Sequence, residues 1–274
     1  MAAFLTGIVL PHKLGTLVRS TESKKTDLSM SEILQIQDIT KTFGGLSALT
    51  RVSVSIHEGE SVGLIGPNGA GKTTLFNVIS GMKPNSGRII FRGKDITGLK
   101  SHEICHRGIA RTFQLVRPFL ELSTLDNVTC ALIFGRRKNE ETALGEIREE
   151  AANILKLVKL DHRTRHLAKE LVFAERRRLE LARALATGPD LILLDEAMAG
   201  LSAPEATQIL DIVAKLKSDY HLTFFLVEHV LRLITAICNR IIVLNFGERL
   251  AEGPPKEVLQ RPEVITAYLG GKHA

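Results

Sequence analysis

The sequence predicts an α/β fold built on a mainly parallel β-sheet. Short apolar runs of strand length alternate with segments whose apolar residues recur at helical spacing, which is typical of strands joined by crossover helices. A glycine-rich loop stands between one such run, residues 61–65, and a helix expected from Leu75 to Ser80, which Gly81 ends. The chain has 274 residues, 44% of them hydrophobic, which suffices for the core of one large domain or two small ones.

The other elements are predicted from the same two periodicities. Alternating apolar and polar residues predict half-exposed strands early in the chain, and uninterrupted apolar runs predict buried strands later. Strands are expected at 33–37, 51–56, 88–91, 191–194, 222–227 and 241–244, with a hairpin return at 249–251, and helices at 144–158, 176–186 and 206–216. We therefore expect an N-terminal antiparallel β region and a mainly parallel core with an inserted helical subdomain.

The glycine-rich loop fits G-x-x-x-x-G-K-[ST], the phosphate-binding P-loop. Its glycines let backbone N–H groups approach phosphate oxygens, and the following helix adds free N–H groups and partial positive charge. We expect Lys72 to reach the β- and γ-phosphates and the Thr73 hydroxyl to bind Mg²⁺. The loop, predicted to bind nucleotide, consists of Gly66, Pro67, Asn68, Gly69, Ala70, Gly71, Lys72, Thr73 and Thr74.

A second nucleotide signature is the apolar run 191–194 followed by Asp195 and Glu196. A strand that ends at the phosphate pocket places Asp195 where its carboxylate can hold Mg²⁺ through water. Glu196 lies one residue further on, where a carboxylate can polarise the attacking water as general base. The plainer alternative is a strand that simply ends in acidic residues.

Composition limits the partners of the chain. A net charge of +6 favours an anionic partner, but it does not choose among nucleotide, nucleic acid and membrane surface. The basic residues are dispersed, and with 2 Tyr and no Trp the sequence shows no nucleic-acid-binding motif. No apolar run approaches the roughly 20 residues of a membrane span. The 3 cysteines are widely spaced, which argues against a disulfide framework.

The domain organisation follows from a change in composition near residue 30. Residues 1–29 are expected to be an extension outside the fold, with Met30 as the native start; an amphipathic tail that touches a membrane is the alternative. Residues 31–270 are expected to form one domain. Its core comprises about 31–117 and 186–252, its helical subdomain 118–185 and its C-terminal segment 253–274.

The order of these motifs resembles the nucleotide-binding subunit of ABC transporters over residues 31–270, and the LivG type of branched-chain amino acid importers in particular. The P-loop is followed by Gln114, a helical insert, Asp195-Glu196 and Glu228-His229. Local similarity lies in 39–46, 111–114, 178–186 and 264–270. The resemblance implies a P-loop ATPase that uses ATP and Mg²⁺ at the cytoplasmic face of the inner membrane. Its implied partners are two permease subunits and, indirectly, a solute-binding protein.

Matched positions imply further roles. Phe43 resembles the aromatic residue that stacks on adenine, and Gln114 resembles the glutamine that contacts Mg²⁺ and senses the membrane subunits. His229 resembles the histidine that contacts the γ-phosphate. The alternatives are a core aromatic for Phe43, a surface amide for Gln114 and a strand-end histidine for His229.

The chain departs from the family at the signature loop, which is usually Leu-Ser-Gly-Gly-Gln. The serine and the close-approach glycine are absent, and Glu175 brings a carboxylate to a helix N-terminus that should face a phosphate, where Arg176, Arg177 and Arg178 can offset it. We therefore expect an asymmetric dimer with a second, different ATPase chain; the alternative is a regulatory subunit that clamps ATP with little hydrolysis. The altered loop is Leu171, Val172, Phe173, Ala174 and Glu175, and smaller departures occur at Ala197 and Ser202.

Two other readings are weaker. His102, Glu103 and His106 match the zinc motif H-E-x-x-H, but no third ligand has supporting context. A cassette ATPase that acts on DNA or ribosomes usually carries two cassettes or long insertions, and this chain has one compact cassette. The sequence does not indicate the transported solute, because the residues that contact the solute belong to the binding protein and the permeases.

Overall fold

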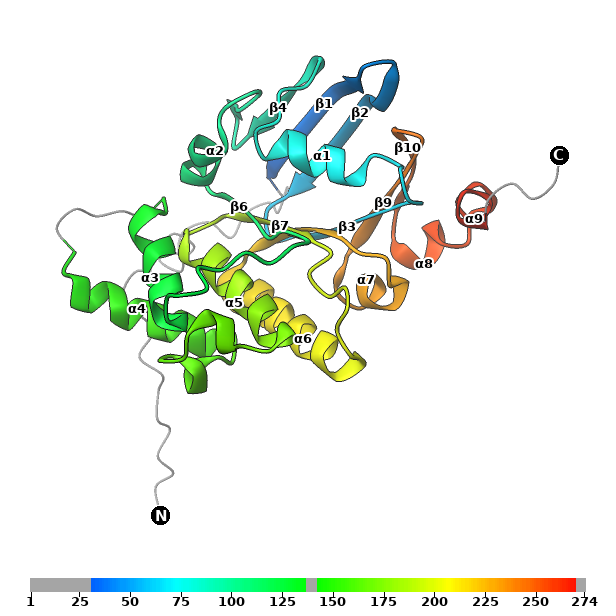
Figure 1. Cartoon of the computed structure of the whole chain (residues 1–274). Coiled ribbons are helices and arrows are strands. Elements are labelled where there is room, and N and C mark those ends of the chain that lie inside the picture. Colours follow the sequence, from blue (N-terminus) through cyan, green and yellow to red (C-terminus); the bar gives the residue numbers. More distant parts are fainter. Residues whose placement is uncertain (1–30, 137–141, 270–274) are drawn as a thin grey trace, which may run out of the picture.

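A computed structural model describes residues 31–136 and 142–269. The predicted extension 1–29 and the end of the predicted C-terminal segment beyond residue 269 lie outside the described residues. In Figure 1 the larger sheet lies between two layers, with helix α1 and the smaller sheet on one side and helices α5, α6 and α7 on the other. This arrangement confirms the predicted α/β fold.

The larger sheet carries the loops that matter for function. Its strand order is β10-β9-β3-β8-β7-β6, and all neighbours are parallel except β10, which runs antiparallel to β9. Because β3, β8 and β7 are adjacent and parallel, their carboxyl ends meet at one edge. The strands are β3 (Ser61–Ile65), β6 (Ile109–Arg111), β7 (Leu191–Asp195), β8 (Thr223–Val227), β9 (Arg240–Asn245) and β10 (Glu248–Gly253).

The smaller sheet is antiparallel, with strand order β2-β1-β4-β5. Its inward-facing residues, among them Leu34 and Ile36, share one apolar core with Phe76 and Ile79 of α1. In β2, buried residues alternate with partly exposed ones from Val52 to His57, which explains the period-2 pattern of the sequence there. The strands are β1 (Glu32–Phe43), β2 (Leu46–His57), β4 (Ser86–Phe91) and β5 (Lys94–Asp95).

The helices complete both layers. Helices α3, α4 and α5 pack on one another where the helical subdomain is predicted, although the predicted boundaries at 118 and 185 stay untested. Among the described residues, no helix is both long and apolar enough to cross a membrane. The helices are α1 (Lys72–Ile79), α2 (Ser101–Arg107), α3 (Thr124–Phe134), α4 (Leu144–Leu157), α5 (Phe173–Ala186), α6 (Ala203–Tyr220), α7 (Leu231–Ile237), α8 (Pro255–Val258) and α9 (Pro262–Leu269), with 3₁₀ turns at Asp161–Arg163 and Ala168–Glu170.

One helix begins earlier than the sequence pattern predicts. The expected helix 176–186 begins at Phe173, because the Glu175 carboxylate accepts the backbone N–H of Val172 at 3.2 Å. Helix α6 begins at Ala203, where Ser202 and Glu205 form the S-x-x-E capping box that the sequence predicts, with Glu205 accepting the backbone N–H of Ser202 at 2.8 Å. Such caps satisfy donors that a helix leaves free at its N-terminus.

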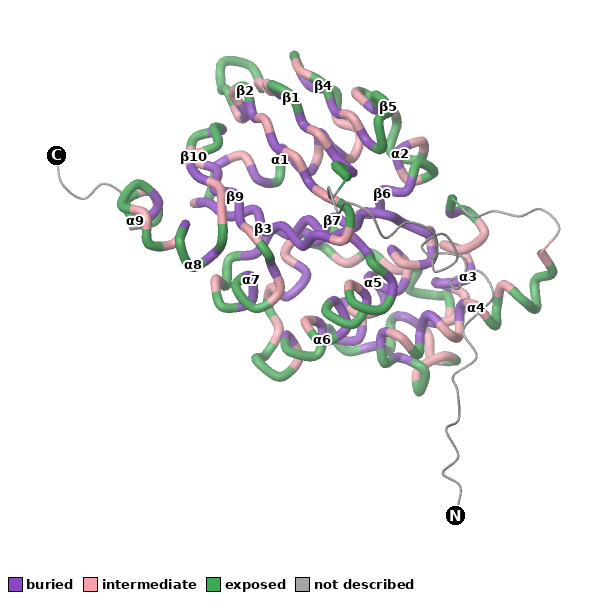
Figure 2. Tube along the Cα trace, turned by 180° about the vertical axis from the view of Figure 1, so that it is seen from behind, coloured by how far each residue is buried: buried purple, intermediate pink, exposed green. Residues whose placement is uncertain are grey.

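Apolar cores lie on both faces of the larger sheet. Phe224 and Leu226 of β8 belong to the cluster on the α5–α6 side, whereas Phe225 and Val227 belong to the cluster on the α1 side. Figure 2 shows the buried strands β3 and β7 crossing the middle of the molecule between these layers. Burial on both faces explains why these strands read as uninterrupted apolar runs.

Arg240 joins the two sheets near the start of β3. Its guanidinium donates to Glu60 through Nε at 2.6 Å and Nη2 at 2.8 Å, and to the carbonyl oxygen of Ser55 in β2 at 2.6 Å. Nη1 also pairs with Glu252 of β10. The Arg240 side chain is 16% exposed and that of Glu60 is 6% exposed, so the pair is largely shielded from water.

We expect Arg240→Met to lower the free energy of unfolding by about 2–4 kcal/mol, because it leaves the buried Glu60 carboxylate without its partner. Arg249→Met is the matched control. Its side chain pairs with the same Glu252 but is 45% exposed, so its loss should cost less than about 1 kcal/mol. Urea unfolding of the three proteins measures both effects, and equal losses in the two variants would contradict the assignment.

Candidate active site

The P-loop connects the end of β3 to the start of α1, as its motif predicts. Its glycines are required by packing as well as by backbone angles. A Cβ on Gly66 would lie 2.1 Å from the carbonyl oxygen of Leu244, and one on Gly71 would lie 2.5 Å from that of Ala48. Gly71 also has a φ of +101°, which other residues rarely adopt. The loop is therefore held tightly between β9 and the β1–β2 hairpin.

Lys72 begins α1 and is 6% exposed. Its Nζ donates to the carbonyl oxygens of Gly66 at 2.8 Å and Pro67 at 3.0 Å, so the ammonium lies over the loop itself. Burial lowers the pKa of Lys72, and the nearby charges of Glu196 and Asp195 oppose that shift. A buried ammonium beside free helix N–H groups is a strong anion-binding arrangement.

Asp195 ends β7 and is 3% exposed. Its backbone N–H donates to the Thr112 hydroxyl at 3.3 Å, and its Oδ2 accepts Arg111 Nη2 at 2.7 Å. The carboxylate thus lies at the same sheet edge as the P-loop. Arg111 belongs to a stretch that the sequence pattern singled out, but the pattern gave it no role.

Glu196 is the centre of a three-residue cluster that the sequence predicts only as separate residues. Its Oε2 accepts Gln114 Nε2 at 2.8 Å, and its Oε1 contacts His229 Nε2 at 2.9 Å. The Glu196 side chain is 14% exposed, and its φ of +49° places it in the left-handed region. The structure therefore brings together residues from three distant parts of the chain around one carboxylate, which suits a general base.

Glu228 lies beneath this cluster and was missed as a site residue by sequence reasoning. It is 3% exposed, and its Oε1 accepts the backbone N–H of Met198 at 2.9 Å. Burial, together with the negative charge of Glu196, raises the pKa of Glu228 to about 7. The available signal in the sequence was an acidic residue directly after the buried strand 222–227.

Phe43 lies at the end of β1 and is 47% exposed, so it is not a core aromatic. Its ring centroid lies 5.2 Å from Nζ of Lys41. The hairpin that carries Phe43 contacts Gly71 of the P-loop through Ala48 and Leu49. An exposed ring on a hairpin that touches the P-loop is free to stack on another flat group.

The altered signature loop leads into α5. Val172 and Phe173 are 59% and 49% exposed, whereas Leu171 and Ala174 are buried. Glu175 is also buried, and its Oε1 accepts Arg163 Nε at 2.8 Å. Burial opposes ionisation of Glu175, but the bonds from Arg163 and the Val172 backbone outweigh it and lower the pKa.

The structure corrects the electrostatic expectation for this loop. Glu175 Oε1 pairs with Arg163, and His162 Nε2 lies 3.5 Å from the same oxygen. Of the three following arginines, Arg178 is close enough for its charge to interact with that of Glu175. Arg177 is itself buried, and its Nη1 donates to the carbonyl oxygen of Phe113 at 3.1 Å. Side chains from outside the loop therefore balance the negative charge of Glu175.

The H-E-x-x-H residues lie on α2 and have local roles. Glu103 accepts the backbone N–H of Lys100 at 2.9 Å, which caps the helix, and His106 contacts the carbonyl oxygen of Phe134 at 3.1 Å. Across the part of the chain that the structure describes, no group of three or more His, Cys, Asp or Glu residues is placed to hold a metal ion.

The oxygen donors beside the P-loop fit a different kind of ion. The Thr73 hydroxyl stands at the start of α1, the Asp195 carboxylate ends β7, and Gln114 supplies an amide oxygen in the Glu196 cluster. Few protein oxygens, completed by water and phosphate, are what Mg²⁺ takes in nucleotide sites. The donor set therefore matches Mg²⁺ better than Zn²⁺.

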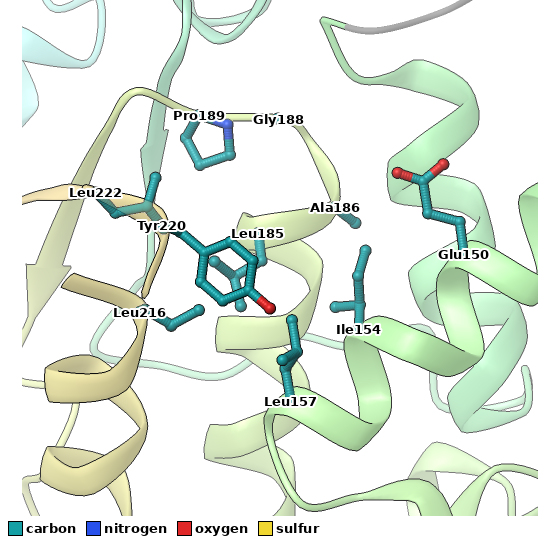
Figure 3. Close-up of a pocket in the computed structure, with 10 residues that line it drawn as sticks. All are labelled: Glu150, Ile154, Leu157, Leu185, Ala186, Gly188, Pro189, Leu216, Tyr220 and Leu222. Carbon is teal, nitrogen blue, oxygen red and sulfur yellow. The ribbon is translucent and has the colours of Figure 1, made fainter. Parts of the chain in front are cut away.

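The pocket in Figure 3 lies at the opposite edge of the larger sheet, between α4, α5 and α6. Apolar side chains such as Leu157, Leu185 and Leu216 line it together with the Tyr220 ring, which lies among them in Figure 3. Its cavity of about 30 Å³ holds little more than one water molecule. This pocket is therefore separate from the P-loop site and too small for a nucleotide.

Comparison with known sequences places this site in a family. The ABC transporter family matches residues 49–199, and the family of branched-chain amino acid ATP-binding cassette transporters matches residues 248–274. The chain belongs to the ABC transporter family. Members of this family carry an ATP-binding cassette, so the P-loop edge of the larger sheet is the nucleotide-binding edge of an ATPase subunit.

Two curated relatives match this chain over nearly the whole of their own length. The high-affinity branched-chain amino acid transport ATP-binding protein BraF of Pseudomonas aeruginosa is 38% identical over 251 residues, which are 87% of this chain and 98% of BraF. The corresponding protein LivG of Escherichia coli K12 is 37% identical over 249 residues, with 87% and 98% covered. These matches confirm the LivG-type resemblance.

Solved structures agree with the fold of this ABC cassette. The ADP conformation of an ABC transporter ATP-binding cassette superposes with a TM-score of 0.80 at 36% identity, covering 88% of this chain and 99% of that one. The dimeric structure of a post-hydrolysis cassette bound to ADP and Pi gives a TM-score of 0.73 at 29% identity, covering 81% and 98%.

The buried Glu228 of this ABC ATPase predicts a pH-dependent stability. Its folded pKa of about 7 exceeds the ordinary 4.5, so between these values the folded chain holds a proton that the unfolded chain has lost. Stability therefore falls as pH rises through this window. Glutamine at position 228 does not titrate. We therefore expect the free energy of unfolding of Glu228→Gln to exceed that of wild type by about 2–3 kcal/mol at pH 8, with no such gain at pH 4.5.

Urea unfolding across pH 4.5–8 measures this difference. Glu248→Gln, in exposed β10, is the control and should follow the wild-type profile. Parallel profiles for wild type and Glu228→Gln would show that the Glu228 carboxyl ionises normally in the folded chain.

Proposed function

We propose that this chain binds and hydrolyses ATP to energise an importer for branched-chain amino acids. The observation that carries the proposal is the Glu196 carboxylate, held by Gln114 and His229 at the edge where Lys72 and Asp195 also lie. The class of solute is supported by the names of BraF and LivG and by the match of residues 248–274.

The proposed mechanism assigns a role to each group. The P-loop N–H groups and Lys72 hold the β- and γ-phosphates, and Phe43 stacks on the adenine ring. Thr73, Asp195 and Gln114 would hold Mg²⁺, which would neutralise charge on the phosphate oxygens. Glu196 accepts a hydrogen bond from the attacking water and takes up its proton. His229 orients Glu196 and donates to the γ-phosphate as charge develops.

The second ATPase subunit is proposed from the altered signature loop. In the family, each nucleotide lies between the P-loop of one chain and the signature loop of the other. Val172 and Phe173 present exposed apolar side chains where a serine hydroxyl and a glycine usually face phosphate. The loop of this chain therefore offers few donors, and a partner with an ordinary loop completes the site at Lys72. A dimeric cassette among the structural relatives supports this geometry.

The membrane partners are proposed to dock beside Gln114. The segment between β6 and α3 exposes Phe113, Leu115, Phe119 and Leu120, whose exposed fractions are 55%, 68%, 51% and 45%. Clustered exposed apolar side chains are typical of a binding surface. We assign this surface to the two permease subunits, which places the chain at the cytoplasmic face of the membrane, with the solute-binding protein acting only through the permeases.

The regulatory alternative has lost its support. It rested on the altered signature loop, and none of the relatives named above supports it; the one acidic residue of that loop, Glu175, is paired with Arg163. The general base, the P-loop lysine and the metal carboxylate are all present at one edge, which favours hydrolysis over clamping alone.

We expect Glu196→Gln to lower the steady-state ATPase rate of the assembled transporter by at least about 100-fold, because the amide cannot accept the proton of the water. ATP binding should persist, since Lys72 and the loop are unchanged. Phosphate release and equilibrium ATP binding measure the two properties. Glu58→Gln, whose side chain is 49% exposed, is the control and should keep the wild-type rate. Unchanged turnover in Glu196→Gln would remove Glu196 from the reaction.

We expect the purified chain alone to turn over ATP slowly and a second ATPase chain with an intact Leu-Ser-Gly-Gly-Gln loop to raise turnover by at least about tenfold. Lys72→Ala in this chain should abolish most of the gain, because that lysine holds the phosphates of the completed site. A steady-state assay of the mixed chains measures it. Full activity of this chain by itself would contradict the asymmetric dimer.

A further inference from the structure

We propose that Arg111 is a positioning residue, which holds the Asp195 carboxylate toward the metal–nucleotide complex and ties it to the segment that carries Gln114. Arg111 ends β6, and its side chain is 8% exposed. The inference rests on the proposed function, because it assumes that Mg²⁺ and ATP bind at this edge.

The contacts of Arg111 join two elements of the site. Nη2 donates to Asp195 Oδ2 at 2.7 Å, which reaches the end of β7. Nη1 donates to Asn77 Oδ1 at 2.8 Å and to Ser80 Oγ at 3.4 Å, both on or next to the helix that begins at Lys72. A guanidinium holds its donors in a fixed plane, so one side chain sets the distance between the metal carboxylate and the P-loop helix.

Aromatic rings fix the plane of this guanidinium. The Arg111 Cζ lies 5.7 Å from the ring centroid of Phe76 and 5.1 Å from that of Phe113. Phe76 is fully buried in the core, so the side chain of Arg111 has little freedom to leave Asp195. A pair that served only for charge balance would not need this confinement.

The residues after Arg111 are anchored in the same way. Thr112 N–H donates to the carbonyl oxygen of Leu193 at 3.0 Å, and its hydroxyl accepts the N–H of Asp195 at 3.3 Å. Phe113 N–H donates to Glu180 Oε1 at 2.6 Å. Gln114 follows directly. A shift of Asp195 relative to β6 therefore displaces the attachment point of Gln114.

Asp195 needs such a partner because of its surroundings. It is 3% exposed, and the Lys72 ammonium is a second cation close enough to interact with it. Without Arg111, attraction would turn the carboxylate toward the Lys72 ammonium and away from the metal position. A lysine at position 111 retains the charge but offers a single point donor, so it can reach Asp195 or Asn77 but does not span both.

Ion pairing at the other end of β7 provides a matched control. Asp190 precedes Leu191, is 8% exposed and pairs with Arg136, far along the strand from the nucleotide edge. Arg136→Met removes this contact, although Arg92 Nη1 also lies 3.3 Å from Asp190 Oδ2 and the Arg136 side chain is 34% exposed. Urea unfolding of both variants therefore separates a loss of stability from a loss of Mg²⁺-dependent affinity.

The experiment measures equilibrium ATP binding by the full chain with Mg²⁺ and with EDTA, and takes the ratio of the two dissociation constants. We expect Arg111→Met to reduce this Mg²⁺-dependent gain in affinity by at least about tenfold, with ATP binding in EDTA nearly unchanged. Arg111→Lys should reduce the gain by about threefold, and Arg136→Met should leave it at the wild-type value. Urea unfolding of each variant confirms that the chains are folded.

An undiminished Mg²⁺ gain in folded Arg111→Met would overturn the proposal, and so would an equal loss in Arg136→Met. Where Arg111→Met does not fold, Arg111→Lys decides, because a Mg²⁺ gain equal to wild type in that variant contradicts a role for the planar donor set. Failure of the proposed function is distinguishable. In that case the wild-type chain binds ATP in neither condition.

Discussion

The pairing of three parallel strands, β3, β8 and β7, is the constraint on which the rest of the site depends. Leu64 pairs with Val227, and Val227 pairs in turn with Asp195, so the three strands end at the same height. The ladder continues one residue beyond β7, where Glu196 N–H donates to the carbonyl oxygen of Val227 at 2.9 Å. This register alone sets the P-loop, Asp195 and Glu196 side by side, and a slip by one residue would separate the proposed metal ligand and general base from the P-loop.

That same register concentrates acidic groups, and the fold compensates each of them differently. Asp195 accepts the Arg111 guanidinium, and Glu196 contacts the Gln114 amide and the His229 imidazole. Glu228 accepts one backbone N–H, and the pKa of its carboxyl is raised to about 7. Like charges this close cannot all ionise at low cost in a buried environment. The raised pKa of Glu228 therefore reduces its negative charge near neutral pH, close to the Glu196 carboxylate.

The sequence was sufficient where function depends on local pattern, and insufficient where it depends on contacts between distant residues. The P-loop, the buried run before Asp195 and the N-terminal strands are each recognised from residues that are neighbours in the sequence. The structure has a loop, a buried strand and N-terminal strands at these places. The start of α5 was missed for a local reason: Glu175 accepts the N–H of Val172, but Val172 lacks the side-chain hydroxyl by which a capping box is recognised in a sequence. The pairing of Glu175 was not predictable, because it depends on where Arg163, 12 positions away, lies after folding. Arg111 and Asp195 are likewise 84 positions apart, and no spacing rule connects them. The sequence identified Glu228 only as the neighbour of His229, since its unusual pKa comes from burial.

Helix α5 contacts both surfaces that are proposed to bind partner subunits. Its N-terminus carries the exposed Val172 and Phe173, proposed to face the nucleotide of the second ATPase chain. Further along the helix, Arg177 Nη1 donates to the carbonyl oxygen of Phe113 at 3.1 Å, and Glu180 accepts the N–H of Phe113 at 2.6 Å. Both backbone groups of the residue before Gln114 are therefore bonded to α5. A helix transmits displacement along its axis with little deformation, because its backbone hydrogen bonds are short and its core side is close-packed. The segment that holds Gln114 is thus bonded to α5, and through Gln114 Nε2 it is bonded to the Glu196 carboxylate. One helix and one short segment therefore connect the proposed dimer surface, the proposed permease surface and the proposed general base.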